Sequence, residues 1–331
     1  MNAAPAGGRP IYLHSYLAPL AAVLERGDVT DVYVNRPGEY WVETTTGAIE
    51  RHDAPGLDAT TLDRLARQIA ALSHQGISRE HPLLSATLPD GARVQIVAPP
   101  ATRGPLAIAI RKHVSSDLAL DDYVASGAFT DTHRGQPGER AAIDVELARK
   151  LDAGDIAGML ATAVRARKNI LVSGGTSTGK TTFLNALMRE IPAEERLILI
   201  EDTPELRLRH DNAVGLLAAR SALGEAQVSA DDLLAASLRM RPDRIIVGEL
   251  RGPEAYTFLR AVNTGHPGSM TTVHADSAER AIEQIALLVL QTGTRLGRED
   301  VHHYVRNTVD VFVQLARTAG RRHVAEVLLA R

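Results

Sequence analysis

A glycine-rich segment in the second half of the chain has the residue types and the spacing of a phosphate-binding loop. It fits the pattern G-x-x-x-x-G-K-[ST], with an apolar strand pattern before it (residues 169–173) and a helical pattern after it (residues 183–189). In such a loop, backbone N–H groups surround phosphates, the lysine reaches the β- and γ-phosphate oxygens, and the next hydroxyl ligates Mg²⁺. The sequence therefore predicts a site for ATP and Mg²⁺. The predicted nucleotide-binding residues are Gly174, Gly175, Thr176, Ser177, Thr178, Gly179, Lys180, Thr181 and Thr182, with Thr181 on the metal.

Two carboxylates at predicted strand ends could complete a hydrolytic site. The apolar run over residues 244–247 leads through Gly248 into Glu249, which could orient the attacking water. The run over residues 197–200 ends in Glu201, which could reach the metal through a Mg²⁺-bound water. Many P-loop enzymes place a metal-binding aspartate where this chain has Gly248, so a second carboxylate is needed. The alternative is that each acid is only a solvated strand end.

Three further side chains are weaker candidates for the site. His274 follows a predicted strand in a glycine-rich region and could donate a hydrogen bond to the γ-phosphate, although a lone histidine is as often a packed or capping residue. Arg93 and Arg111 lie on predicted strands of the first half of the chain. A second domain packed over a P-loop commonly lends arginines to the phosphates, but a strand arginine usually only extends into solvent.

The first third of the chain has the pattern of a small α+β domain with a mainly antiparallel sheet. Residues 1–10 are rich in Ala, Gly and Pro and are predicted to be disordered, and the domain is predicted over residues 11–112. Asp90-Gly91 between two alternating runs is a hairpin signal. The predicted elements are strands near 32–34 and 40–42, a helix over 59–72, a hairpin over 83–97 and a strand over 106–111.

The rest of the chain has the pattern of a parallel α/β domain. A polar, glycine-rich stretch predicts a linker over residues 113–144, and a domain follows over residues 145–331. Short apolar runs there alternate with helical patterns, as in a parallel sheet with helices on both faces. The last two runs, residues 309–315 and 323–329, predict a strand pair at one edge of this sheet.

The composition limits the classes of function. The 331 residues suit two domains, and 37 basic against 40 acidic residues argue against a dedicated polyanion binder. The chain has no cysteine, so a disulfide framework and a thiolate zinc site are excluded. The start of the chain lacks a signal-peptide pattern, and we expect a cytoplasmic protein.

Four motifs, in this order and spacing, resemble the P-loop, Asp box, Walker B and His box of the secretion traffic ATPase superfamily. They lie at residues 174–182, 200–206, 238–252 and 263–277. Together with Asn35-Arg-Pro-Gly38 and Arg93-Val-Gln-Ile96, they are most similar to the VirB-eleven-type ATPases of type IV secretion systems.

This resemblance implies a homohexameric ring of subunits, each with an amino-terminal domain, a linker and a RecA-like domain, and ATP between the two domains. It implies that Glu249 is the Walker B glutamate, Glu201 belongs to the Asp box and His274 is the His-box histidine. It also places Arg93 and Arg111 where family members contact nucleotide phosphates. The implied partners are inner-membrane secretion proteins, with peripheral contact at the cytoplasmic face of that membrane and no sequence-specific nucleic-acid binding.

Other functions stay open at this point. ATPases of conjugation and of type IV or tight-adherence pili share nearly the same motifs, whereas the type II secretion branch usually carries a four-cysteine element that is missing here. A nucleic-acid motor is disfavoured by the neutral charge and by the 4% aromatic content, which leaves few stacking platforms. A scaffold that binds ATP without turnover is the non-enzymatic alternative.

Overall fold

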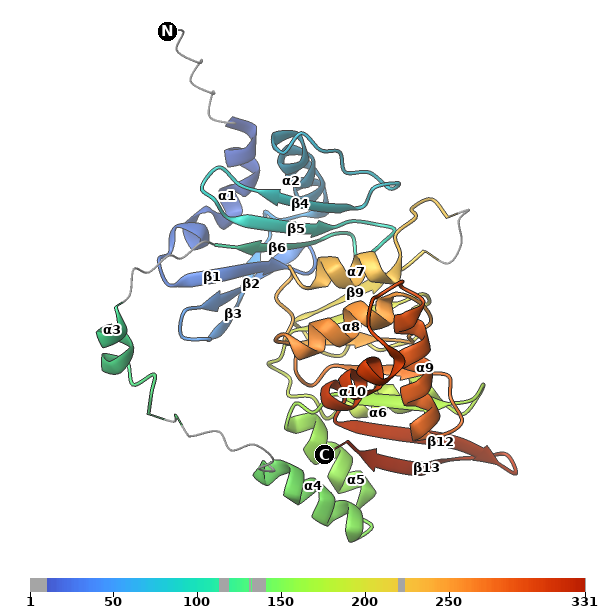
Figure 1. Cartoon of the computed structure of the whole chain (residues 1–331). Coiled ribbons are helices and arrows are strands. Elements are labelled where there is room, and N and C mark those ends of the chain that lie inside the picture. Colours follow the sequence, from blue (N-terminus) through green and yellow to red (C-terminus); the bar gives the residue numbers. More distant parts are fainter. Residues whose placement is uncertain (1–10, 113–118, 131, 133–140, 220–223, 331) are drawn as a thin grey trace.

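The computed structural model describes residues 11–112, 119–130, 132, 141–219 and 224–330, which form two domains (Figure 1). The predicted disordered start, residues 1–10, lies outside the described residues, and so does much of the predicted linker (113–118, 131 and 133–140). Between the domains, the short helix α3 (Leu120–Ala125) has no buried residue. No helix among the described residues has both the length and the apolar composition needed to cross a membrane.

The amino-terminal domain is an antiparallel sheet packed against two helices. Its described strands have the order β3-β2-β1-β6-β5-β4, and each neighbouring pair is antiparallel. Apolar side chains from both helices join those of the strands in one core, which confirms the predicted α+β domain. The elements are α1 (Ile11–Glu25), β1 (Val29–Val34), β2 (Gly38–Thr44), β3 (Ile49–Ala54), α2 (Ala59–Leu72), β4 (Leu83–Thr87), β5 (Arg93–Val97) and β6 (Ala107–Arg111).

The carboxy-terminal domain is a mostly parallel sheet covered by helices on both faces. The described strand order is β13-β12-β7-β11-β10-β8-β9, and only the β12–β13 pair among these is antiparallel, which confirms the predicted edge pair. The strands are β7 (Ile170–Gly174), β8 (Leu197–Glu201), β9 (Ala213–Leu217), β10 (Arg244–Val247), β11 (Met270–Val273), β12 (Val311–Thr318) and β13 (Arg321–Leu329). The helices are α4 (Ala142–Asp152), α5 (Ile156–Arg165), α6 (Lys180–Met188), α7 (Ala230–Ser237), α8 (Glu254–Asn263), α9 (Ala278–Leu290) and α10 (Arg298–Thr308).

Two strands were not expected from the sequence. β3 reads Ile-Glu-Arg-His-Asp-Ala, so its apolar content is too low for a strand signal, and it pairs at the edge of the first sheet. β9 follows a polar stretch and contains Gly215, which interrupts its short apolar run. Both strands form because a neighbouring strand supplies the backbone partners, a tertiary effect that local pattern does not carry.

The two domains meet along β9, the outer strand of the second sheet (Figure 1). In the loop between β5 and β6, Thr102 forms an antiparallel bridge with Leu216. The Leu217 N–H donates to the Ala101 carbonyl at 2.9 Å, and the Arg103 N–H donates to the Gly215 carbonyl, also at 2.9 Å. A short segment of the amino-terminal domain therefore covers an edge that would otherwise expose unpaired backbone groups.

A buried arginine of the carboxy-terminal domain, Arg196, also contacts the amino-terminal domain. The Arg196 guanidinium donates to the side-chain oxygens of Asn35 (2.7 Å) and Asn212 (2.5 Å), and it lies 4.0 Å from the ring centroid of Tyr33. Burial lowers the pKa of Arg196 to about 10, so the group stays charged near neutral pH. Asn35 and Tyr33 belong to the first domain, so the fit between domains depends on specific polar contacts.

Candidate nucleotide site

The P-loop connects the end of β7 to the start of α6 and has the backbone geometry of a phosphate cradle. Gly179 (φ +95°) and Ser177 (φ 62°) both adopt the left-handed conformation, which is why a glycine suits the position before the helix. A Cβ at Gly174 would overlap the Thr178 side chain and lie 3.0 Å from the Leu315 carbonyl oxygen. The first backbone N–H groups of α6 have no partner within the helix and point to this loop.

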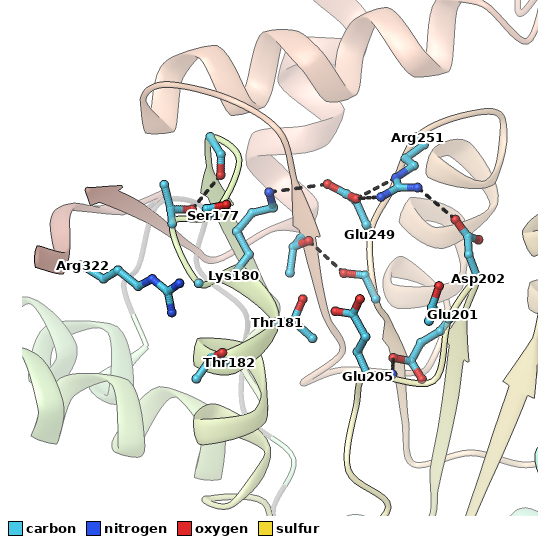
Figure 2. A pocket seen from close by; sticks show the side chains of 16 residues that line it. Ser177, Lys180, Thr181, Thr182, Glu201, Asp202, Glu205, Glu249, Arg251 and Arg322 are labelled. Carbon is cyan, nitrogen blue, oxygen red and sulfur yellow. Dashed lines mark hydrogen bonds and ion pairs between the residues drawn. The ribbon is translucent and has the colours of Figure 1, made fainter. Parts of the chain in front are cut away.

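The loop opens onto a cavity of about 310 Å³ at the carboxyl ends of the strands (Figure 2). This is the edge at which parallel α/β sheets bind ligands. Its described lining comes from the carboxy-terminal domain alone: the P-loop and the start of α6, the end of β8 and the segment after it, the segment after β10, one residue of β11 and one residue of β13. The resemblance implied a nucleotide between the two domains, whereas the described amino-terminal residues do not line this cavity.

Lys180 lies between the P-loop and the end of β10. Its Nζ donates to the Gly174 carbonyl at 3.0 Å, lies 3.6 Å from Oε1 of Glu249, and lies 3.2 Å from Nδ1 of His274. Burial lowers the pKa of Lys180, and the Glu249 carboxylate partly offsets that effect. The ammonium is thus held at the mouth of the loop, where it could reach a phosphate.

Glu249 is the centre of a polar cluster at the end of β10. Its Oε1 lies 2.9 Å from Nε2 of His274, and its Oε2 accepts from Nε of Arg251 at 2.6 Å. Arg251 also donates to Asp202 at 3.2 Å, so it links the ends of β10 and β8. The structure therefore brings together three residues that the sequence singled out, namely Lys180, Glu249 and His274, and adds Arg251.

Glu201 lines the same cavity, but its carboxylate makes structural contacts. Oε1 accepts the backbone N–H groups of Glu205 (3.0 Å) and Leu206 (2.7 Å), while Oε2 forms an ion pair with Arg103 of the amino-terminal domain. The Glu201 side chain is only 4% exposed. The Glu201 carboxylate is thus already bound by the turn after β8 and by the amino-terminal domain.

Glu205 is a carboxylate in the cavity that sequence reasoning missed. Its side chain points toward the middle of the cavity, and that of Thr181 points toward the same region (Figure 2). A rule based on strand ends selects Glu201, because Glu205 lies four residues beyond β8. The signal that could have found it is Thr203-Pro204, a turn that returns the chain to the sheet edge.

Arg93 and Arg111 do not line the P-loop cavity of their own chain. They are directly opposite each other on β5 and β6, and Arg111 Nε donates to Asp31 at 2.8 Å. Both line a second cavity, of about 550 Å³, together with Arg239 and Gln95. The physical reason is the packing of the first sheet against β9, which leaves these arginines on a different side of the molecule from the P-loop.

Arg322 of β13 is another residue of the cavity that the sequence did not indicate. Its Cδ lies 3.3 Å from the position that a Cβ of Gly179 would occupy, and its side chain points toward the P-loop (Figure 2). An arginine in a terminal hairpin carries no local signal for a phosphate site. Only the order of the strands, with β12 beside β7, brings the hairpin to the P-loop.

Residues 141–327 match the family model described as "Type II/IV secretion system protein". The chain is 40% identical to the type IV secretion system protein VirB11 of Brucella suis over 96% of this chain and 90% of that protein. It is 39% identical to PtlH of Bordetella pertussis, also a type IV secretion system protein, over 94% of this chain and 93% of that one.

The fold agrees with this sequence similarity. The crystal structure of the VirB11 ATPase of Brucella suis in complex with sulphate superposes with a TM-score of 0.90 at 39% identity, covering 96% of this chain and 97% of that one. The carboxy-terminal domain is accordingly a RecA-like P-loop domain, as the sequence predicted. By its motifs, its cavity and its relatives, this chain belongs to the type II/IV secretion system protein family, within the branch of the VirB11 ATPases.

Proposed function

We propose that this protein is a Mg²⁺-dependent ATP hydrolase whose domain motion powers type IV secretion. The observation that carries the proposal is the cavity in which Lys180 and Thr181 of the P-loop face Glu249, in a chain closely related to VirB11 ATPases along nearly its whole length. We assign residues 11–112 to the amino-terminal domain, 113–144 to the linker and 145–331 to the RecA-like domain.

The nucleotide phosphates would lie against the P-loop, residues 174–182. The loop fits them, because Gly175 and residues 177–182 line the cavity and because Gly179 holds the left-handed turn that starts α6. Lys180 would bind the β- and γ-phosphates. Its ammonium lies 3.6 Å from the Glu249 carboxylate, and this long contact would be exchanged for a phosphate oxygen when nucleotide binds. Thr182 would contact the phosphates from the next position of the helix.

The residues around Thr181 fit a magnesium ion held mainly by the nucleotide. The described residues contain no cluster of three His, Asp or Glu side chains that would bind a metal alone, and Mg²⁺ in such sites is commonly held by one or two carboxylates plus phosphates. When bound, Mg²⁺ would neutralise charge on the transferring phosphoryl group. Thr181 would ligate it. Glu205, whose side chain points into the cavity, is better placed than the 4% exposed Glu201 to accept a hydrogen bond from a Mg²⁺-bound water.

Hydrolysis would then depend on Glu249 orienting the attacking water in line with the γ-phosphate. The His274 ring lies between the two groups, with Nε2 2.9 Å from the Glu249 carboxylate and Nδ1 3.2 Å from Nζ of Lys180. A shift of Glu249 or of Lys180 toward bound nucleotide would therefore also change the surroundings of His274. The catalytic work is mainly placement and electrostatic stabilisation.

A homohexameric ring would complete this site with residues of a neighbour. Arg93 and Arg111 lie on one surface of the amino-terminal domain and do not reach the P-loop of their own chain, so we assign them to the nucleotide of the adjacent subunit. The relatives are named type IV secretion system proteins, which supports partners in such a secretion machinery. That these partners lie in the inner membrane, that this protein is cytoplasmic and that it touches the membrane peripherally are parts of the proposal carried by the family resemblance. Sequence-specific binding of nucleic acid is not part of the proposal.

The first experiment is phosphate release by the purified full chain and by its Lys180→Ala variant, with and without Mg²⁺, together with the mass in solution. Turnover that needs both Mg²⁺ and Lys180, from a particle of six subunits, is the expected result. A monomer that binds ATP without turnover would instead be a nucleotide-gated scaffold. Turnover that rises with single-stranded DNA would indicate a nucleic-acid motor.

A further inference from the structure

Arg103 is a residue of the amino-terminal domain whose side chain enters the RecA-like domain. Its backbone extends the isolated bridge between Thr102 and β9, through the 2.9 Å hydrogen bond to the Gly215 carbonyl. From there the side chain crosses β9 at Gly215, where an added Cβ would lie 2.6 Å from Cδ of Arg103. A glycine in the strand is thus what lets the arginine lie flat across it.

The guanidinium ends on the turn that follows β8. It donates from Nη1 to the Leu206 carbonyl at 2.7 Å, and Nη2 forms the ion pair with Glu201. Glu201 in turn accepts the backbone N–H groups of Glu205 and Leu206. The Arg103 side chain is only 15% exposed, and burial lowers its pKa, so the pair sits where screening by solvent is weak.

This turn supplies one wall of the nucleotide cavity. Asp202, Thr203 and Glu205 all line the cavity. In the chain they lie between Glu201 and Leu206, the two residues that the Arg103 side chain contacts. A carboxylate that acts on a metal-bound water must be placed to within a fraction of an ångström, and a displacement of about 1 Å can cost about a hundredfold in rate.

We propose that Arg103 is an interdomain positioning residue: the amino-terminal domain sets the conformation of the turn at residues 201–206, and hence the place of Glu205 in the cavity. Loss of the strand pairing between residues 101–103 and β9 releases the turn, so turnover depends on how the domains sit on each other. This inference rests on the proposed ATP hydrolysis and names a residue outside the P-loop motifs that controls it.

The test compares Arg103→Gln with Gly215→Ala in the full-length protein. Gly215→Ala keeps the arginine but displaces its flexible side chain by the added methyl group. Both variants are expected to lower kcat about 10- to 100-fold while the affinity for a fluorescent ATP analogue changes less than about threefold. The matched control is Arg79→Gln, which breaks the exposed interdomain ion pair with Glu225 far from the P-loop cavity and should keep the parent kcat.

A double-mutant cycle with Glu205→Gln separates positioning from general weakening of the interface. If Arg103 acts through Glu205, the double variant is no slower than Glu205→Gln alone. Fully additive losses, an unchanged kcat in Arg103→Gln, or an equal loss in Arg79→Gln would overturn the inference.

A readout independent of turnover distinguishes failure of this inference from failure of the proposed function. Amide hydrogen exchange at Glu205 and Leu206 should become faster in Arg103→Gln and in Gly215→Ala but not in Arg79→Gln. If the parent protein shows no hydrolysis but this exchange pattern is found, the positioning role of Arg103 is supported and the ATPase proposal fails. If exchange at these amides is unchanged in the variants, the positioning role is wrong, whatever the turnover.

Discussion

Lys180 and Glu249 face each other across the mouth of the P-loop, with Nζ of the lysine 3.6 Å from Oε1 of the glutamate. The same carboxylate contacts His274 and Arg251, so one acid at the end of β10 has three basic side chains as neighbours. A carboxylate with this many partners has a fixed position, which is what the orientation of an attacking water requires.

The Glu249→Gln variant should bind ATP but lose hydrolysis. Glutamine keeps the shape of the side chain and removes the charge that orients the water, so we expect kcat to fall about 100- to 1000-fold with little loss of affinity. Phosphate release and binding of a fluorescent ATP analogue would be measured on the same preparation. Hydrolysis at the parent rate would remove Glu249 from the catalytic role.

Glu201 and Glu205 should respond differently to the same change. Glu201→Gln leaves the buried guanidinium of Arg103 without its carboxylate, and we expect a loss of about 2 kcal/mol in the free energy of unfolding. Glu205→Gln should lower kcat while that free energy stays unchanged within about 0.5 kcal/mol, because its carboxylate lies in the open cavity, whereas in Glu201→Gln a fall in kcat should accompany the loss of stability. Denaturant unfolding and phosphate release compare the two. Equal stabilities with a loss of turnover only in Glu201→Gln would favour Glu201 over Glu205 as the carboxylate that acts on the metal-bound water.

The features that could be predicted from the sequence depend on local residue patterns. The P-loop could be found because its chemistry needs glycines, a lysine and a hydroxyl at fixed spacing, and Glu249 because a buried strand runs straight into it. The helix predicted over residues 59–72 coincides with α2, whose N-cap Asp58 accepts from the Thr61 N–H at 2.7 Å. Each of these features depends on neighbours a few residues away.

What the sequence concealed depends on residues far apart in the chain. The sequence selects Glu201 because it ends a strand, but it does not show that Arg103 of the other domain pairs with this carboxylate. Arg322 reaches the P-loop only because β12 inserts beside β7. The places of Arg93 and Arg111 follow from how one sheet packs on the edge of another, and neither local pattern nor hydrophobic periodicity encodes that contact.

Arg322→Ala should weaken nucleotide binding and leave the chemical step intact. No ion pair joins Arg322 to another of the described residues, and its guanidinium lies beside Gly179, on the other side of Lys180 from Glu249 (Figure 2). We expect the dissociation constant of ATP to rise about tenfold, as for the loss of one charge-assisted contact, with kcat at saturation changed less than twofold. Arg321→Ala, the exposed neighbour, is the control. A loss of kcat with unchanged affinity would contradict a binding role.

Asn35→Ala should loosen the contact between the domains. Asn35 is buried, accepts from Arg196 at 2.7 Å and donates to Asn212 at 2.9 Å, so the alanine leaves a buried guanidinium N–H without its acceptor. Such a loss costs about 1–3 kcal/mol in the free energy of unfolding. Arg36→Ala, the next residue, removes a half-exposed partner of Glu39 and should cost about 0.5 kcal/mol or less. Denaturant unfolding of the full chain measures both, and equal effects would mean that Arg196 does not hold the domains together through Asn35.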